Sequence, residues 1–341
     1  MHFGLHSKPG LPEVALVRGP AQAVRGEVFR RGVPRKVPWN TLKDFTGWQS
    51  SGEFMRSDQV FRQINLWLAA RLPAGSEVVV IRDVGLGDVV MASAAVRALA
   101  RAKPHWKVSF FTSKRYAPLF DGPWEAEGVG FLEEVRGRFQ NVFDQRWLVE
   151  RDPQKDVEDR KRIFFRNLGL PFPERLDAPI FVSREAEEQA TALLGPTGRF
   201  PLALICPESS GSPRSFGERA VEQIRRLVIA QGMAPVVVGE RRVKRDGGLL
   251  DLTGRTSVTV LAALVKRAAI VYATDSGPMH LAGLMGRPCV AYFNEVRPEL
   301  RCEGYPSVVP IWQLGSLDVL NQAELSSATT MAMEQSTVEV A

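Results

Sequence analysis

A glycine turn that leads into an aspartate is the first feature of the sequence that could carry chemistry. Gly85, Gly87 and Asp88 lie in DVGLGDVV, between a valine-rich run and an alanine-rich stretch. A glycine turn before a helix usually binds phosphate, because a helix N-terminus attracts anions. Asp88 would repel that phosphate. It could instead accept a hydrogen bond from a substrate hydroxyl, for which Gly85 and Gly87 leave room. A structural aspartate at a helix start is the alternative.

A dinucleotide site at this turn is disfavoured by two departures from the usual fingerprint. The pattern G-x-G-x-x-G requires a third glycine at position 90, where Val90 stands. It also requires an acidic residue about 20 residues later to bind a ribose, and the next apolar run ends in FFTSK. A nicotinamide-dependent oxidoreductase is therefore a weak interpretation.

A second loop offers groups that could bind a diphosphate. CPESSGSPRSF, at 206–216, contains Ser209, Ser210 and Arg214 between an expected strand and an expected helix. Hydroxyls, exposed amides and one cation suit the oxygens of a diphosphate.

A third loop, ATDSGPMHLAGLMGRP at 273–288, again joins an expected strand to an expected helix. Asp275 or Ser276 suits the helix N-cap, and Gly277 would let a ligand approach the backbone. His280 is one helical turn further on. Either it belongs to the same site, or it is a hydrogen-bonded helix histidine with no ligand. In open α/β sheets, ligands bind at the carboxyl ends of strands, where both loops are expected.

The elements that would position these loops alternate between strand and helix, which predicts parallel sheets. The first series has strands at 77–83 and 107–112 around a helix at 88–102. A mainly helical stretch at 156–194 contains the domain junction. The second series has strands at 202–206, 235–239, 269–274 and 288–293, with helices at 216–230, 258–267 and 277–285. After residue 317 we expect a closing helix or a frayed end. A β-rich unit at 14–37 and a helix at 58–71 are expected before the first series.

Length and charge divide the chain. Its 341 residues suggest two domains, and residues 1–76 hold 11 basic and 5 acidic side chains, against 33 of each in the remainder. The basic segment favours an anionic partner, such as nucleic acid or a phosphorylated lipid, or is only a solvated face. Cys206, Cys289 and Cys302 indicate neither a disulfide framework nor a zinc site. No apolar stretch is long enough for a membrane span or a signal sequence, which predicts a cytoplasmic protein.

From about Glu77 to Trp312 the sequence resembles glycosyltransferase family 9, whose best-known members are heptosyltransferases of the lipopolysaccharide inner core. The matching segments include VVVIRDVGLGDVVMASAAVRALARAKP, RIFFRNLGLPFPERLDAPIF, CPESSGSPRSF and the D-[ST]-G-x-x-H motif from Asp275 to His280. The resemblance implies an α/β protein of the GT-B fold, with two Rossmann-like domains facing a cleft, here with a small β-rich extension.

The resemblance also implies roles for the loop residues. Asp88 corresponds to the general base, which takes the acceptor proton as the anomeric carbon is inverted. Ser209, Ser210 and Arg214 correspond to positions around the donor diphosphate, although the basic position is often lysine in the family. Asp275, Ser276, Gly277 and His280 correspond to the loop beside the nucleotide and phosphates. No D-x-D triplet occurs in the chain, so we expect transfer without a metal or a cofactor, with the nucleotide-diphosphate sugar as co-substrate.

These expectations define four segments and one preferred function. The segments are a basic extension at 1–76, an acceptor domain at 77–184, a nucleotide-sugar domain at 185–322 and a tail at 323–341. The preferred acceptor is an anionic saccharide or glycolipid such as lipopolysaccharide core, at the cytoplasmic side of the inner membrane. Two alternatives stay open: a phage-type glycosyltransferase that modifies DNA bases, because the extension is basic, and a catalytically silent nucleotide-sugar binding protein.

Overall fold

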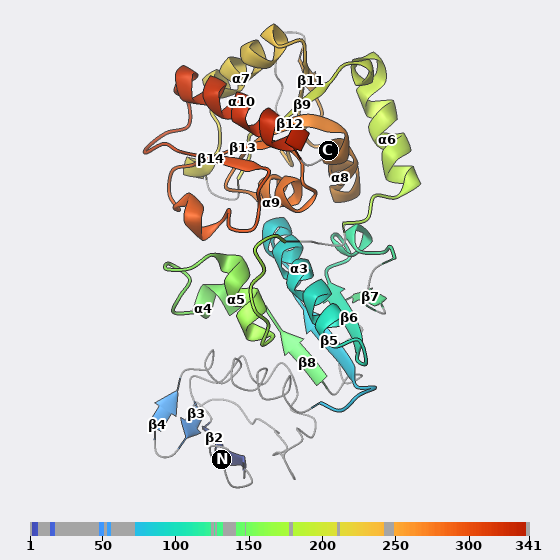
Figure 1. Ribbon diagram of the computed structural model, residues 1–341, viewed down its shortest axis with the longest axis vertical. Coiled ribbons are helices and arrows are strands. Elements are labelled where there is room, and N and C mark those ends of the chain that lie inside the picture. Colours follow the sequence, from blue (N-terminus) through green and yellow to red (C-terminus); the bar gives the residue numbers. More distant parts are fainter. Residues whose placement is uncertain are drawn as a thin grey trace.

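Two parallel α/β sheets make up most of the described molecule (Figure 1). The computed structural model describes residues 2–5, 14–17, 48–50, 53–55, 72–123, 126, 128–131, 141–146, 148–176, 180–209, 212–241 and 249–338. Within that part of the chain no helix is both long and apolar enough to cross a membrane.

The first parallel sheet has the strand order β7-β6-β5-β8. Its strands are β5 (Glu77–Ile81), β6 (Lys107–Thr112), β7 (Gly128–Phe131) and β8 (Asn141–Asp144). Val78 and Val80 of β5 pack in the main core, whereas Val79 and Ile81 contact Phe111 in a second cluster. Burial on both faces explains why the strand is a continuous apolar run rather than an alternating one.

Helix α3 (Leu86–Ala102) connects β5 to β6, as the sequence predicts. It begins after Gly85, whose φ of +78° suits a residue without a side chain. Asp88 lies in its first turn and Arg101 in its last, and both charges suit the helix dipole. Its valines and most of its alanines are buried, so the helix packs closely on the sheet and places its N-terminus at the carboxyl ends of the strands.

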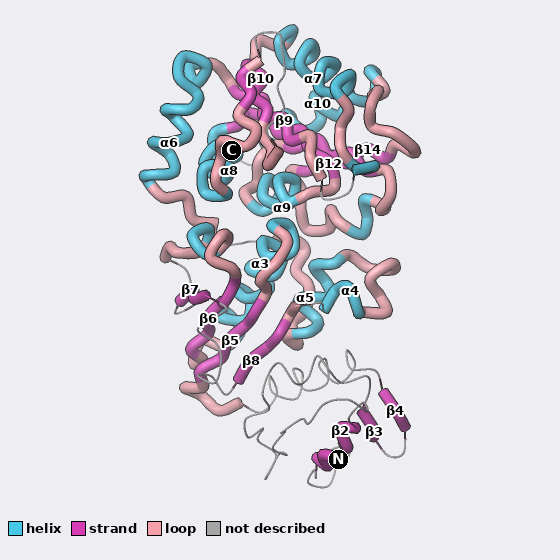
Figure 2. Tube along the Cα trace, turned by 180° about the vertical axis from the view of Figure 1, so that it is seen from behind, coloured by secondary structure: helices cyan, strands magenta, loops and turns pink. Residues whose placement is uncertain are grey.

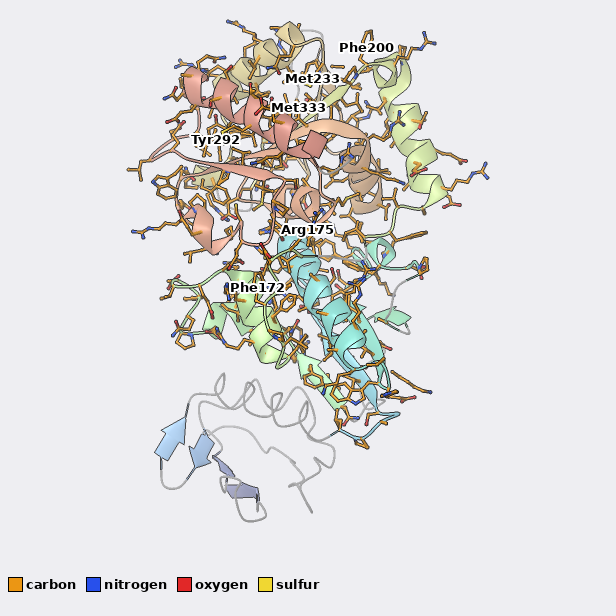
Figure 3. The ribbon with its side chains drawn as sticks, in the orientation of Figure 1. Phe172, Arg175, Phe200, Met233, Tyr292 and Met333 are labelled. Atoms are coloured by element: carbon orange, nitrogen blue, oxygen red, sulfur yellow. The ribbon has the colours of Figure 1, made fainter. Side chains whose placement is uncertain are left out.

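The chain crosses from the first sheet to the second between two capped helices. Helix α4 (Leu148–Arg151) precedes α5 (Arg160–Asn167), whose N-cap residue is Asp159. Helix α6 (Arg184–Leu194) follows, and its N-cap residue is Ser183. Each cap side chain accepts a hydrogen bond from a backbone amide of the first turn. The connection between α5 and α6 contains Phe172, which packs edge-to-face on Phe165 of α5, and Arg175, which lies where the two halves meet (Figure 3).

The second sheet has six parallel strands in the order β11-β10-β9-β12-β13-β14. The strands are β9 (Leu202–Cys206), β10 (Ala234–Val237), β11 (Leu250–Asp251), β12 (Ala268–Thr274), β13 (Cys289–Phe293) and β14 (Val308–Trp312). Its helices are α7 (Glu218–Ala230), α8 (Val258–Arg267), α9 (Gly277–Leu284) and α10 (Gln322–Val338). Tyr292 of β13 packs edge-to-face on Phe216 in a core separate from the main one.

The C-terminal segment forms a helix, one of the two outcomes left open by the sequence. Leu325, Ala328 and Ala332 of α10 are buried at helical spacing, and α10 packs on β12, β13 and β14. The hydroxyls of Thr329 and Tyr272 share a hydrogen bond of 3.0 Å. The buried stripe consists mainly of small residues, which explains why its sequence pattern is weak.

Four short strands in the N-terminal extension pair in antiparallel order. They are β1 (His2–Leu5), β2 (Val14–Val17), β3 (Trp48–Ser50) and β4 (Glu53–Met55). Of these, only β2 lies in the β-rich unit expected at 14–37, whose residues 18–37 lie outside the described part of the chain. β1, β3 and β4 were not predicted. The helix expected at 58–71 lies outside the described residues.

The two parallel sheets meet through the N-terminal ends of α3 and α9, which lie side by side in both views (Figure 2). A Cβ atom on Gly87 would lie 2.8 Å from Cδ2 of His280. A Cβ atom on Gly277 would lie 2.8 Å from Cβ of Leu86. Both glycines therefore allow one helix end to approach the other. Both also line a cavity between the two sheets, so the expectation that they leave room for a ligand stays a prediction.

Candidate active site

A cavity of about 810 Å³ lies between the two sheets, at the carboxyl ends of their strands. Its wall combines the glycine turn before α3, the loop after β9 and the loop after β12. The predicted site residues that line it are Gly85, Gly87, Asp88, Ser209, Arg214, Asp275, Ser276, Gly277 and His280. The fold thus brings together three loops that are far apart in the sequence. Ser210 lies outside the described residues.

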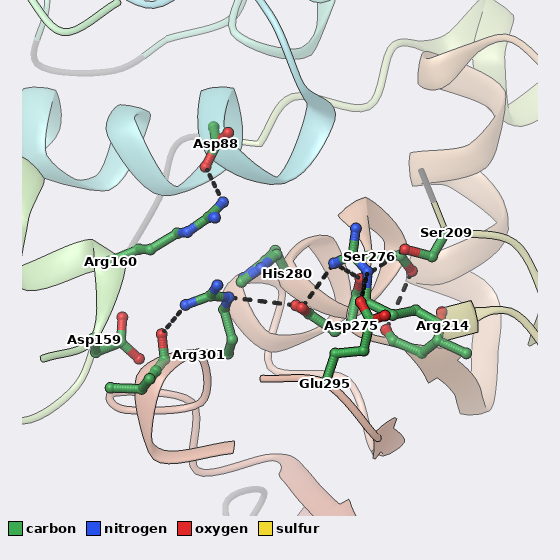
Figure 4. A network of polar contacts seen from close by, with 12 residues as sticks. Asp88, Asp159, Arg160, Ser209, Arg214, Asp275, Ser276, His280, Glu295 and Arg301 are labelled. Atoms are coloured by element: carbon green, nitrogen blue, oxygen red, sulfur yellow. Dashed lines mark hydrogen bonds and ion pairs between the residues drawn. The ribbon is translucent and has the colours of Figure 1, made fainter. Parts of the chain in front are cut away.

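Asp88 is held between two arginines. Its Oδ2 atom lies 2.6 Å from the guanidinium of Arg82, and its Oδ1 atom lies 3.3 Å from that of Arg160. Arg82 is 1% exposed and the side chain of Arg160 is 32% exposed, so one partner is buried and the other faces the cavity (Figure 4). Burial alone would lower the pKa of Arg82, but the carboxylates of Asp88 and Glu150 outweigh it and the pKa is raised. Arg82 is therefore a permanent cation behind Asp88.

The loop after β9 is tied to the loop after β12. Ser209 donates from its hydroxyl to the backbone carbonyl of Asp275 at 3.2 Å, and its amide donates to Oγ of Ser215 at 3.1 Å. Arg214 donates to Oδ2 of Asp275 at 2.9 Å, and its Nε lies 3.5 Å from a carboxylate oxygen of Glu295. Three of the residues predicted around the donor, Ser209, Arg214 and Asp275, therefore form one hydrogen-bonded group.

Ser276 is the N-cap residue of α9, one of the two candidates from the sequence. Its hydroxyl donates to the carbonyl of Thr274 at 3.2 Å rather than accepting from the first turn of the helix. The amides at the start of α9 therefore donate no bond to the cap side chain, and Ser276, Gly277 and Pro278 line the cavity.

Arg301 is a site residue that sequence reasoning missed. It is 4% exposed, lines the cavity, and places its Nε atom 3.5 Å from Oδ1 of Asp275. Burial and the neighbouring Arg160 lower its pKa, and Asp275 opposes this effect. Asp275 is thus paired with Arg214 on one carboxylate oxygen and with Arg301 on the other. The segment RPELRCEGY has no motif that would have drawn attention to Arg301.

His280 is buried at the contact between the two helix ends. Its Nδ1 atom shares a 3.2 Å hydrogen bond with the hydroxyl of Tyr305. Burial, followed by the cations Lys161, Arg301 and Arg160, holds the pKa of His280 well below its ordinary value. The ring is therefore neutral at physiological pH. The histidine lines the cavity and is also hydrogen-bonded within the protein, so features of both sequence interpretations are present.

A buried ion pair connects the two halves beside this site. Lys161 and Asp159 have fully buried side chains and lie 2.8 Å apart. Lys161 also donates to the carbonyl of Arg301 and lies 4.1 Å from the ring centre of Tyr305. Asp159 accepts from the amide of Glu303 at 3.1 Å. Because Lys161 and Asp159 belong to the start of α5, this pair links the first half to the 301–305 segment of the second.

A second link crosses the mouth of the cavity. Arg115, after β6, forms an ion pair of 2.5 Å with Glu240, after β10, and both residues line the cavity. Both side chains are more than half exposed. Exposed pairs contribute little free energy, so this link constrains the two halves weakly compared with the buried pair.

Two parallel α/β sheets that face a shared cavity define the GT-B class of glycosyltransferase fold. The profile of glycosyltransferase family 9 (heptosyltransferase) matches residues 125–305, and the chain belongs to this family. The predicted family and fold class are thereby confirmed.

Relatives and solved structures agree with this assignment. The chain is 22% identical over 202 residues to lipooligosaccharide heptosyltransferase 2 of Haemophilus influenzae, a match that covers 50% of this chain and 58% of the relative. A family 9 glycosyl transferase from Veillonella parvula superposes with a TM-score of 0.64 at 14% identity, covering 76% of this chain and 97% of that structure. E. coli ADP-heptose LPS heptosyltransferase II superposes with a TM-score of 0.63 at 14% identity, covering 76% of this chain and 99% of that structure. E. coli heptosyltransferase WaaC with ADP superposes with a TM-score of 0.56 at 17% identity, covering 75% of this chain and 99% of that structure.

Proposed function

We propose that this protein is an inverting glycosyltransferase that moves a sugar from a nucleotide-diphosphate sugar to an acceptor hydroxyl. The observation that carries the proposal is that the carboxylate of Asp88 and the Arg214–Asp275 group line one cavity from opposite halves of the protein. A base on one wall and anion-binding groups on the other suit a displacement in which the acceptor attacks as a phosphate leaves.

In the proposed step, the acceptor hydroxyl donates its hydrogen bond to Asp88. Its oxygen then attacks the anomeric carbon from the face opposite the diphosphate. The new carbon–oxygen bond forms as the bond to the diphosphate oxygen breaks, and the proton passes to Asp88. The electron pair of the broken bond leaves with the nucleoside diphosphate. One displacement of this kind inverts the configuration of the anomeric carbon.

The donor diphosphate is proposed to bind at Arg214, Arg301, Ser209 and the amide end of α9. These groups lie around Asp275, whose carboxylate already holds both guanidinium groups in place. Fixed cations and helix amides can stabilise a leaving diphosphate without a divalent metal, so we propose metal-independent transfer. ADP-heptose is the first donor to test, because relatives of this fold are ADP-heptose enzymes.

The acceptor is proposed to be an anionic saccharide of lipopolysaccharide core type, bound by the half that contains Asp88. This division makes 77–184 the acceptor domain and 185–322 the donor domain. Arg115 and Arg160 of the first half line the cavity and suit an anionic acceptor. With a glycolipid acceptor, the protein would work in the cytoplasm at the inner membrane surface, and cell fractionation would test that location.

The decisive experiment supplies a panel of nucleotide-sugars, including ADP-heptose, with a truncated lipopolysaccharide core, with duplex DNA, or with no acceptor. We expect nucleotide release that requires the saccharide and a product of inverted anomeric configuration by NMR. Retained configuration would refute the displacement. Nucleotide-sugar binding without release would favour the silent binding protein.

The DNA acceptor is the second candidate because residues 1–76 carry 11 basic and 5 acidic side chains. Transfer to DNA, with an affinity that falls steeply as salt rises and that is lost without residues 1–76, would favour it over the saccharide. The absence of DNA binding at low salt would exclude it.

A further inference from the structure

We propose that Arg82 is a positioning residue that holds Oδ2 of Asp88, so that Oδ1 is the atom that receives the acceptor proton. The inference rests on the proposed function, in which Asp88 is the base. It adds which carboxylate oxygen acts and which residue keeps that oxygen directed into the cavity.

The guanidinium of Arg82 is fixed by contacts on several sides. It donates to Oδ2 of Asp88 at 2.6 Å, to the carbonyl of Gln145 at 3.0 Å and to a carboxylate oxygen of Glu150 at 3.1 Å. It also lies 5.7 Å from the ring centre of Phe164. A planar group held by three acceptors and an aromatic ring cannot follow the movements of a single aspartate, so it imposes its own geometry on Asp88.

The backbone of Arg82 is equally restrained, because it lies directly after β5. Its amide donates to the carbonyl of Phe111 at 3.1 Å, and the amide of Gln145 donates to the carbonyl of Ile81 at 2.8 Å. Arg82 is thus fixed by the neighbouring strands on both sides of β5, and its position is set by the sheet rather than by the cavity loops.

The two oxygens of Asp88 have different surroundings. Oδ2 faces the buried Arg82, and a Cβ atom placed on Gly85 would lie 3.2 Å from it. Oδ1 has a longer contact, 3.3 Å to Arg160, whose side chain is 32% exposed. A substrate hydroxyl can therefore reach Oδ1 beside the partly exposed Arg160, whereas Oδ2 faces the buried Arg82.

A carboxylate at this place in a helix needs such a restraint. Asp88 is the third residue of α3, and a carboxylate there can turn back toward the free amides of the first turn. In that orientation it would cap the helix and no longer point at the acceptor. The strong bond to Arg82 competes with this orientation and keeps the carboxylate available for proton transfer.

A double-mutant cycle separates positioning from a merely structural role. The variants are Arg82→Met, Asp88→Asn and both together, assayed for kcat and donor KM under conditions in which chemistry limits the rate. Arg82→Met should lower kcat by about 10²-fold, the scale of a misplaced reacting group, with donor KM changed less than about twofold. In the Asp88→Asn background it should cause no further loss, because both changes remove the same function.

Arg146→Met is the matched control, since Arg146 forms a comparable pair with Asp144 at 2.9 Å outside the cavity wall. It should leave kcat unchanged. The inference would be overturned if Arg82→Met lowered kcat equally in the wild-type and Asp88→Asn proteins. It would also be overturned if Arg82→Met changed only the donor KM. If Arg82→Met does not fold, Arg82→Lys enters the same cycle with the same criteria. Wild-type turnover by Asp88→Asn would instead refute the proposed base itself, so the two failures are distinguishable.

Discussion

Replacement of Lys161 by methionine tests whether the buried ion pair holds the two halves of the protein together. Lys161 and Asp159 have fully buried side chains, and the methionine would leave the Asp159 carboxylate without its cation. Removing one partner of a buried pair typically costs about 3–5 kcal/mol, because the remaining charge is uncompensated.

The remaining contacts of Asp159 place the expected cost near the lower end of that range. Its Oδ1 still accepts from the amide of Lys161 at 2.8 Å, and its Oδ2 from the amide of Glu303 at 3.1 Å. These two bonds compensate part of the carboxylate charge. The lost ammonium also donated to the carbonyl of Arg301 and contacted the ring of Tyr305, so we expect a loss of about 3 kcal/mol.

The assay is urea unfolding, followed by a probe in each half so that a departure from two-state behaviour is visible. The control is Lys266→Met, which removes an exposed pair with Glu187 of 2.6 Å and should cost about 0–1 kcal/mol. Asp159→Asn in the Lys161→Met background should recover part of the loss, because it removes the uncompensated charge. A loss from Lys161→Met no larger than that of the control would refute the reasoning.

Four further outcomes are expected. Asp88→Asn should lower kcat by about 10² to 10⁴ with donor binding little changed, and near wild-type turnover in a chemistry-limited assay would contradict the base role. Arg214→Ala should weaken donor affinity or turnover by at most about 3 kcal/mol, whereas the exposed Arg219→Ala should have no effect. Activity should survive a chelator, and a loss restored by magnesium or manganese would count against metal-independent transfer. Burial holds the pKa of His280 lower in the folded protein than in the unfolded chain. Below about pH 6.5 the unfolded chain therefore binds more protons, and the free energy of unfolding should decrease by up to about 1.4 kcal/mol for each unit by which the pH is lowered. His280→Gln should reduce this slope, measured by unfolding at several pH values.

The sequence predicted those elements best whose buried residues form continuous or regular patterns. Strands β6 and β9 and helix α8 have the predicted bounds. In α8 the hydroxyl of Ser257 accepts from the amide of Val260, a cap that marks the helix start in the sequence. Within the two parallel sheets four strands were not predicted: β7, β8, β11 and β14. β14 contains Pro310 and forms one edge of its sheet, where such a residue is tolerated but weakens the pattern.

The site was predictable where it follows motifs and not where it depends on long-range pairing. Arg214 and Asp275 lie in loops, and Asp88 directly after one, whose glycines and serines are unusual enough to recognise. Arg160 and Arg301 reach the same cavity from segments without a pattern, and Arg160 is 72 residues from Asp88 in sequence. Arginine is common, so only the folded arrangement shows which arginines contact these carboxylates.

Packing and chemistry use the same two helix ends. The N-termini of α3 and α9 approach each other because Gly87 and Gly277 have no side chains, and each carries the partial positive charge of its helix dipole into the cavity wall. At α3 this charge is matched by Asp88, so an anion gains little there. At α9 the carboxylate of Asp275 pairs with Arg214 and Arg301, and Glu295 lies 3.5 Å from Arg214. The first turn of α9 itself holds no acidic residue and no side-chain cap, so its partial positive charge is not matched within the helix. The same kind of helix end can therefore present a base in one half and bind a diphosphate in the other, and the contact between Gly87 and His280 sets how closely these two functions lie together.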